Sequence, residues 1–384
     1  MTVYLDNATT SWPKPLVVVE AMSKALNDFP GNAGRSAHSM SLHAARLLFE
    51  TREYLAEMFH VPQSDNVIFT ANATYAANFA LYGMLKKGDH VITTSLEHNA
   101  VMRPLKDLES KRTIGLTVLP LSADKPLCLP LLKEAITPQT RMLCMTHGSN
   151  VNGTLLSLKE AGKLCHQNNI LFFVDASQTA GIVPINMNDM HIDLMVFSGH
   201  KKMMGPSGIG VLCINGKHPL RPLIRGGTGS LSEHFAQPDF LPDALEAGTP
   251  NIPGIAGLYA AAKYIMQTGI KNIYAKTKQL ADHLISQLQH MEELTIYEPL
   301  WAGSHLPIVA FNIKNMTCSY VAEQLDQNFG IMCRSGLHCA PQAHKALGSF
   351  PQGSVRCSPG MFNTFEDITY TINALKTIIH NENH

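Results

Sequence analysis

The sequence predicts an α/β protein in which a large domain, built on a mostly parallel sheet flanked by helices, precedes a smaller α+β domain. Its 384 residues, 45% of them hydrophobic, suffice for a large core and for two domains. Short apolar runs bounded by turn residues alternate with stretches of helical period from about residue 16 to about residue 255. This alternation is typical of a parallel sheet with helical crossovers.

The predicted strands of the large domain cover residues 67–70, 90–94, 142–146, 171–174, 194–198 and 210–214. Helical patterns such as 73–85 and 159–167 lie between them and fit crossover helices. A long helical region follows the stretch 246–251, and strands near 308–313 and 354–358 indicate the smaller domain. We expect an N-terminal segment (1–15) that packs on the small domain or the active site, a large domain (16–255) and a small domain (256–384).

The composition excludes several classes of function. Thirty basic residues balance thirty acidic ones, so no charge surplus favours nucleic acid or an anionic membrane as a partner. The first residues show no secretory signal pattern and no apolar run approaches ~18 residues, which predicts a cytoplasmic protein that does not cross a membrane. Eight cysteines without CxxC spacing suit neither a disulfide framework nor a zinc site, so we expect no metal and mostly reduced, buried thiols.

Residues 197–210 carry the most specific pattern, a buried strand that runs into a lysine-bearing, glycine-rich turn. Burial lowers the pKa of a lysine ammonium, and a neutral amine condenses with an aldehyde cofactor. Lys201 is therefore a candidate for a Schiff base with pyridoxal 5′-phosphate (PLP). The alternative is a solvated surface lysine.

The apolar strand over 171–174 leads directly into Asp175, and polar groups at the carboxyl ends of parallel strands face the ligand crevice. A buried aspartate there would keep the ring nitrogen of PLP protonated. Gln178 would donate to the phenolic oxygen of the cofactor. The alternative is an aspartate that caps the next helix.

Two further turns follow predicted strands. In residues 69–78 a small polar turn leads into a helix, where the amide of Ala73 and the hydroxyl of Thr74 suit a phosphate, with Ser198 and His200 approaching from the lysine turn. A plain N-cap is the alternative. In residues 95–101, His98 is placed to stack on the pyridine ring and to exchange protons with the substrate, although it is one of eighteen histidines.

Together with residues 4–10, 32–38, 146–153 and 246–251, these segments resemble the class V aminotransferase family of fold type I PLP enzymes. The resemblance spans nearly the whole chain and is strongest to the cysteine desulfurase and selenocysteine lyase members. It implies that Asn150 lies near the phenolic oxygen of the cofactor and the substrate. It also implies that Thr249 reaches the phosphate of the other subunit, so an obligate homodimer is expected.

The C-terminal segment distinguishes the reaction, because aminotransferases, lyases and epimerases share the PLP residues. Residues 333–341 resemble the active-site loop of group II cysteine desulfurases, with Cys339 as the nucleophile. Arg334 or His338 would favour the thiolate. The alternative for a lone cysteine is a buried packing residue, which is what we expect of Cys333.

Seventeen residues after Cys339, Arg356 lies on a short predicted strand, where a guanidinium can hold a substrate carboxylate with two hydrogen bonds. The resemblance implies substrate contacts from a set of four side chains: Arg356, Asn150, His38 and Arg334. The chain departs from many group II members at Leu337, where they have a second histidine, and at Ala73, where they have a threonine.

The resulting hypothesis is a cysteine desulfurase. L-Cysteine would lose its sulfur to Cys339, giving L-alanine and an enzyme persulfide, while Lys201 removes the α-proton. The sulfur would then pass to an acceptor protein or a small thiol. The alternatives are a selenocysteine lyase acting on L-selenocysteine, another class V aminotransferase or lyase in which Cys339 is incidental, and a scaffold protein that kept only the fold.

Overall fold

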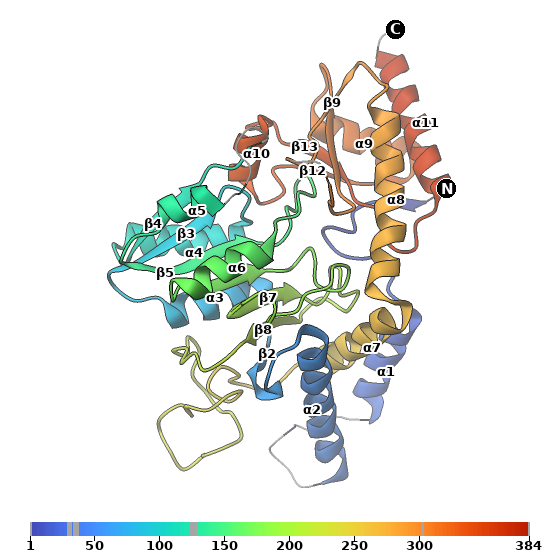
Figure 1. Cartoon of the computed structure of the whole chain (residues 1–384). Helices are drawn as coiled ribbons and strands as arrows, with labels where there is room; N and C mark the ends of the chain where they lie inside the picture. Colours follow the sequence, from blue (N-terminus) through green and yellow to red (C-terminus); the bar gives the residue numbers. More distant parts are fainter. Residues whose placement is uncertain are drawn as a thin grey trace.

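The computed structural model describes residues 2–28, 33, 38–122, 127, 129–300 and 303–382. Figure 1 shows a broad region of sheet and helices that contains β2 to β8, next to a second region around the helices α8, α9 and α11. Both chain ends lie on the side of the second region. Within the described ranges, no helix combines the length and the apolar character needed to span a bilayer.

The large sheet has seven strands in the order β2-β8-β7-β6-β5-β3-β4. Their bounds are β2 (Val67–Thr70), β3 (Asp89–Thr94), β4 (Ile114–Leu119), β5 (Thr140–Thr146), β6 (Leu171–Asp175), β7 (Leu194–Ser198) and β8 (Gly210–Ile214). Strands β7, β6, β5, β3 and β4 pair in parallel, whereas β8 runs antiparallel to β2 and β7. The turns that follow the parallel strands therefore meet at one edge of the sheet.

A hydrophobic core lies on each face of this sheet. In β6, Phe172 and Val174 pack in the core shared with α2, α6 and α7, whereas Leu171 and Phe173 pack in the core shared with α3 and α4. Burial on both faces explains why the strand is a continuous apolar run. The helices are α1 (Leu16–Asp28), α2 (Ser39–Phe59), α3 (Ala73–Met84), α4 (Asn99–Ser110), α5 (Leu129–Ala135), α6 (Leu158–Gln167) and α7 (Ile252–Thr268), with a 3-10 turn η1 (Ser64–Asn66).

The second sheet is antiparallel, in the order β12-β13-β10-β9. Its strands are β9 (Leu294–Ile296), β10 (Val309–Ile313), β12 (Arg334–Gly336) and β13 (Ser354–Cys357). Its core contains side chains of α8 (Ile270–Leu288), α9 (Cys318–Phe329) and α11 (Phe365–Glu382), while α10 (Pro341–Leu347) follows β12. The N-terminal segment joins this region, because β1 (Val3–Tyr4) pairs with β11 (Ile331–Met332) and Asp6 bridges Ser358.

The fold class predicted from the sequence is confirmed, and every predicted strand of the large domain lies within two residues of the observed bounds. β4 was not predicted. It is the edge strand of the sheet, and its exposed Gly115 and partly exposed Thr117 interrupt the apolar run. The proposed boundary between residues 255 and 256 lies inside α7, and the division into domains stays a prediction.

Candidate active site

A cavity of about 320 Å³ lies at the edge where the parallel strands end. The ends of β5, β6 and β7, the first turns of α3 and α4, the N-terminal segment and strands β12 and β13 all contribute to its lining. Most of the site residues predicted from the sequence meet here: Ala73, Thr74, His98, Asn150, Asp175, Gln178, Ser198, His200, Lys201, Arg334 and Arg356.

Lys201 lies in the turn after β7 and borders both this cavity and a second one of about 20 Å³. Burial lowers the pKa of its amine, Asp175 opposes that shift, and the nearby Arg356 and Arg334 add to it. Lys202 lines only the smaller cavity. Lys201 is therefore not a solvated surface lysine, and the lowered pKa is a shift toward the neutral amine, the form that bonds covalently to an aldehyde.

Asp175 is the last residue of β6 and is buried. The register of the sheet places it beside Thr146 of β5 and Val196 of β7. Its Oδ1 accepts the backbone N–H of Ser177 at 2.9 Å. Since turns rather than a helix follow this residue, the alternative of a helix-capping aspartate is wrong.

The first turn of α3 faces the cavity. Asn72 is its N-cap and accepts the Tyr75 N–H at 3.1 Å, so the N-cap alternative is correct for Asn72. The backbone N–H groups of Ala73 and Thr74 precede the first intrahelical hydrogen bonds and remain available to an anion. A Cβ on Gly210 of β8 would lie 2.3 Å from the Asn72 carbonyl carbon, so only glycine lets β8 pack this close to the turn.

His98 is the N-cap of α4, and its Nδ1 accepts the Ala100 N–H at 3.0 Å. Burial lowers the pKa of this imidazole to about 4, and the positive charge of Lys201 acts in the same direction. At neutral pH the ring is therefore uncharged. Because Nδ1 is an acceptor, the proton is on Nε2, which is the ring position left for exchange with a substrate.

Three buried polar atoms of residues that line the cavity lack a hydrogen-bond partner within the described part of the chain: Gln178 Oε1, His200 Nδ1 and Ser177 Oγ. Buried polar atoms without partners are costly, so a polar ligand is expected at this place. PLP, with its phosphate, phenolic oxygen and ring nitrogen, fits such a lining. Gln178 Nε2 already donates to the Ala8 carbonyl at 2.8 Å, which leaves one N–H for the predicted donor role.

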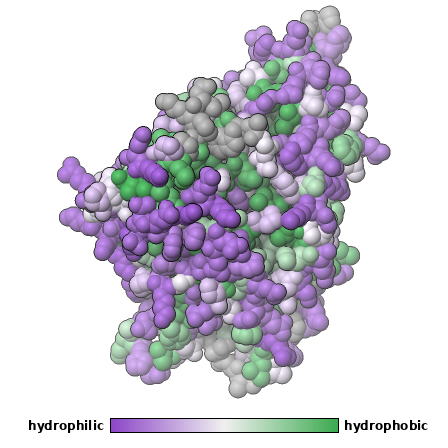
Figure 2. All heavy atoms as spheres, in the orientation of Figure 1, coloured by the Kyte–Doolittle hydropathy of each residue, from purple (hydrophilic) through white to green (hydrophobic). Residues whose placement is uncertain are grey.

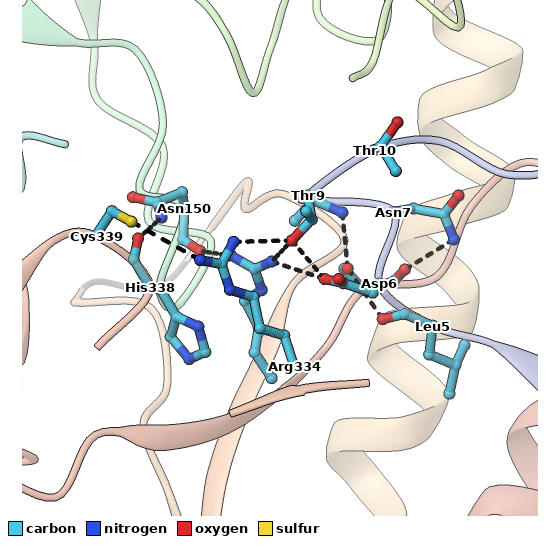
Figure 3. A network of polar contacts seen from close by, with 12 residues as sticks. Leu5, Asp6, Asn7, Thr9, Thr10, Asn150, Arg334, His338 and Cys339 are labelled. Atoms are coloured by element: carbon cyan, nitrogen blue, oxygen red, sulfur yellow. Dashed lines mark hydrogen bonds and ion pairs between the residues drawn. The ribbon is translucent and has the colours of Figure 1, made fainter. Parts of the chain in front are cut away.

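Cys339 is exposed, and Figure 3 shows its sulfur next to Arg334. It lines an adjoining hollow of about 410 Å³ that shares Thr74, His98 and Ala100 with the cavity. Arg334 Nη2 is 3.8 Å from the Cys339 sulfur. The Cys339 carbonyl accepts the Asn99 N–H at 2.8 Å, which ties the loop to α4.

Of the two residues predicted to favour the thiolate, Arg334 or His338, His338 is directed away from the sulfur. His338 and Cys339 both have positive φ, 48° and 57°, and this turn points the imidazole into the interior. His338 Nε2 is 3.1 Å from the Ser354 carbonyl, and burial lowers the pKa of the ring far below neutrality. Only Arg334 of the two predicted partners contacts the sulfur. Cys333, expected to be a buried packing residue, is partly buried and packs against the core of the second sheet.

Arg356 is almost completely buried on β13. Its Nη1 donates to the Asn150 carbonyl at 2.8 Å, and its Nη2 donates to Asp6 at 2.9 Å and to Thr9 Oγ1 at 2.8 Å. Its Nε has no partner within the described residues. A substrate carboxylate would therefore bind the remaining N–H groups or replace one of the present acceptors.

Besides Cys339, two further predicted residues do not line the cavity. Thr249 borders a separate hollow of about 570 Å³ with side chains of α2, including Phe49 and Arg52. His38 is the exposed N-cap of α2 and accepts the Ser41 N–H at 3.2 Å. In the stretch 32–38, the residues before His38 lie outside the described residues, except for Ala33. Cys128 also lies outside them.

Sequence reasoning missed three residues of the site. Asp6 and Thr9 lie in the N-terminal segment, which was predicted to pack on the small domain or the active site but without any residue assigned to the site. Glu97 immediately precedes His98, is completely buried, and accepts the Thr146 N–H at 2.9 Å. Burial raises the pKa of Glu97 to about 8. The signal for Glu97 was its place at a strand end next to a candidate histidine.

Comparison with known proteins gives the family. The model of aminotransferase class-V matches residues 3–370. A probable cysteine desulfurase of Methanothermobacter thermautotrophicus is 35% identical over 376 residues, which cover 95% of this chain and 92% of the relative. A cysteine desulfurase of Escherichia coli is 32% identical over 385 residues, covering 98% and 93%. The apo structure of a cysteine desulfurase of Thermococcus onnurineus superposes with a TM-score of 0.92 at 30% identity, covering 99% and 95%. This chain belongs to the aminotransferase class-V family.

Proposed function

We propose that this chain is a PLP-dependent cysteine desulfurase that transfers sulfur from L-cysteine to Cys339 and releases L-alanine. The observation that carries the proposal is the exposed Cys339 thiol, with Arg334 3.8 Å from its sulfur, beside the cavity that contains Lys201. The similarity to relatives named cysteine desulfurase, over nearly their full length, supports the same activity.

The cofactor would be held by the residues that line the cavity. Lys201 would bond covalently to it, Asp175 would face its ring nitrogen and His98 would cover its ring. The first turn of α3 with Thr74, together with Ser198 and His200, would bind its phosphate. When bound, PLP stabilises the negative charge left at a substrate carbon after proton loss.

The side chains of this chain would carry out the remaining steps. Arg356 and Arg334 would bind the substrate carboxylate, with Asn150 as a further substrate contact. Lys201 would remove the α-proton. The Cys339 thiolate would form a disulfide bond with the substrate sulfur while the carbon–sulfur bond breaks, and protonation of the carbon would complete alanine. The persulfide would pass its sulfur to an acceptor protein or a small thiol.

The decisive experiment is a substrate screen with L-cysteine, L-selenocysteine and cysteine sulfinate, in which alanine and the Cys339 persulfide are detected by mass spectrometry. Cys339→Ser is expected to lower sulfide release by about 100-fold or more. Cys333→Ser, six residues away on the core side, is the matched control and retains activity. Undiminished cysteine turnover in Cys339→Ser would refute the proposal. Turnover of selenocysteine with exclusion of cysteine would identify a selenocysteine lyase.

Borohydride labelling tests the attachment site independently of turnover. The purified protein with PLP is expected to be yellow, and reduction fixes the cofactor to Lys201. Lys201→Ala should abolish the label. A label on Lys202, which lines only the smaller cavity, would contradict the assignment.

We also propose a homodimer in which Thr249 serves the site of the other subunit. Apolar side chains reach the surface on α1, α2 and the loop between β8 and α7: Leu16, Val19, Leu26, Leu42, Phe49, Ile224 and Phe235. Figure 2 shows hydrophobic atoms at the lower end of the molecule, where Figure 1 places α2 and this loop. Sedimentation should give twice the chain mass of 42.1 kDa, and a monomer at micromolar concentration would contradict this proposal.

A further inference from the structure

The hydroxyl of Thr9 is hydrogen-bonded to both arginines of the site, and Figure 3 shows Thr9 next to Arg334. Its oxygen accepts a hydrogen bond from Arg334 Nη1 at 3.0 Å and another from Arg356 Nη2 at 2.8 Å. The same hydroxyl donates to Asp6 Oδ1 at 2.8 Å. A hydroxyl has one donor and two acceptor positions, so every hydrogen-bonding position of Thr9 Oγ1 is used.

The two arginines need a shared acceptor because of their register. Arg334 of β12 and Arg356 of β13 are directly opposite each other in an antiparallel pair. Like charges at opposite positions repel, and Arg356 is also almost completely buried. Asp6 supplies the negative charge on Arg356, and Thr9 Oγ1 is the atom bonded to both guanidinium groups.

Arg334 connects this arrangement to the thiol. Its Nη1 is bonded to Thr9, while its Nη2 is 3.8 Å from the Cys339 sulfur. The backbone around Cys339 is held separately, because the Cys339 carbonyl accepts the Asn99 N–H and the His338 carbonyl accepts Asn150 Nδ2 at 2.7 Å. With the loop held, the distance between guanidinium and sulfur depends on what anchors the other end of the guanidinium.

We infer that Thr9 is a positioning residue, whose hydroxyl holds Arg334 against the Cys339 sulfur and Arg356 against the substrate carboxylate. The inference rests on the proposed function for the roles of Cys339 and Arg356, but the geometry of the hydroxyl does not. It also makes the N-terminal segment part of the active site, although it is separated from Arg356 by about 350 residues of chain.

The test compares Thr9→Val, which removes the hydroxyl at nearly constant shape, with Thr9→Ser, which keeps it. The first readout is the rate of Cys339 alkylation by iodoacetamide as a function of pH, followed on the Cys339 peptide by mass spectrometry. At pH 7, Thr9→Val is expected to slow alkylation about three- to ten-fold, whereas Thr9→Ser restores the rate. The second readout is KM for L-cysteine, which should rise about ten-fold in Thr9→Val with a smaller change in kcat.

Thr10→Val is the matched control, because Thr10 Oγ1 donates to the His200 carbonyl at 3.1 Å and is bonded to neither arginine. It should leave the pH profile of alkylation unchanged. In an Arg334→Met background, Thr9→Val should slow alkylation no further, since it acts through Arg334. If Thr9→Val does not fold, Thr9→Ala is measured in its place.

An unchanged profile in Thr9→Val, or an equal loss in Thr9→Ser, would overturn the inference, because the first denies any role and the second shows a packing role only. Full additivity with Arg334→Met would overturn it as well. Failure of the proposed function is distinguishable: in that case Cys339→Ser keeps its turnover while Thr9→Val still slows alkylation.

Discussion

Lys202 offers the sharpest test of the electrostatics around the site. It is 5% exposed, and it lines a cavity of about 20 Å³ together with Lys201, Ser11 and Thr277. Burial lowers the pKa of its amine to about 7, the positive charges of Arg356 and Lys201 add to the shift, and Asp6 opposes it. The perturbation is Lys202→Met, which keeps the length of the side chain and removes the charge.

The sign of the effect follows from the two protonation states. Below pH 7 the lysine is charged in both the folded and the unfolded protein, and the cost of burying the charge is fully present. As the pH rises from about 7 to 10.5, the folded protein releases the proton first and the cost disappears. A shift from 10.5 to about 7 corresponds to about 5 kcal/mol at most.

The assay is urea unfolding of the cofactor-free protein between pH 6 and pH 10. Lys202→Met should raise the free energy of unfolding by about 2 to 5 kcal/mol at pH 6, and the gain should shrink steadily toward pH 10. Lys163→Met on the exposed face of α6 is the control and should change little at any pH. A gain that is independent of pH, or a loss of stability at pH 6, would refute the reasoning.

Three further substitutions test the site and the packing around it. Because burial raises the Glu97 pKa to about 8, the free energy of unfolding falls as the pH rises from 4.5 to 8. Glu97→Gln should therefore raise the free energy of unfolding in urea by about 2 to 5 kcal/mol more at pH 9 than at pH 5. An equal effect at both pH values would contradict this. Glu246 accepts a hydrogen bond from Arg52 Nη2 at 2.6 Å, and Glu246→Ala should lower the free energy of unfolding by about 3 to 5 kcal/mol because it leaves the buried Arg52 charge without its partner. Arg46→Met, at an exposed ion pair, is the control and should lower the free energy of unfolding by under about 1 kcal/mol. Gly210→Ala should displace the first turn of α3 and weaken PLP binding about ten-fold or more, as measured by fluorescence titration. Gly226→Ala is the control: its Cβ would be 3.6 Å from Ala247, and this variant should bind PLP normally.

The local parts of the site were predictable because local sequence determines them. Residues 171–174 of β6 are buried on both faces and form an uninterrupted apolar run, so the carboxylate that ends the strand must lie at the sheet edge. The same logic placed Lys201 after β7 and His98 after β3. In each case the polar residue lies at the end of a strand or within four residues after it.

His338 shows where contiguity misleads. It precedes Cys339 directly, yet two successive residues with positive φ turn its ring away from the sulfur and toward Ser354. Residues other than glycine rarely adopt this conformation, and the residue types at positions 338 and 339 do not predict it. The backbone contacts that hold it come from Asn99 and Asn150, which are distant in sequence.

The N-terminal segment shows a different limit. Asp6 and Thr9 are common residue types, and their role depends on the pairing of β1 with β11 and of Asp6 with Ser358. Only that pairing brings a carboxylate and a hydroxyl to two arginines that β12 and β13 place opposite each other. Without the segment, Arg356 would be buried beside a like charge and without its ion-pair partner, a state that costs several kcal/mol. The two ends of the chain must therefore both be folded before the carboxylate-binding side of the site can be stable.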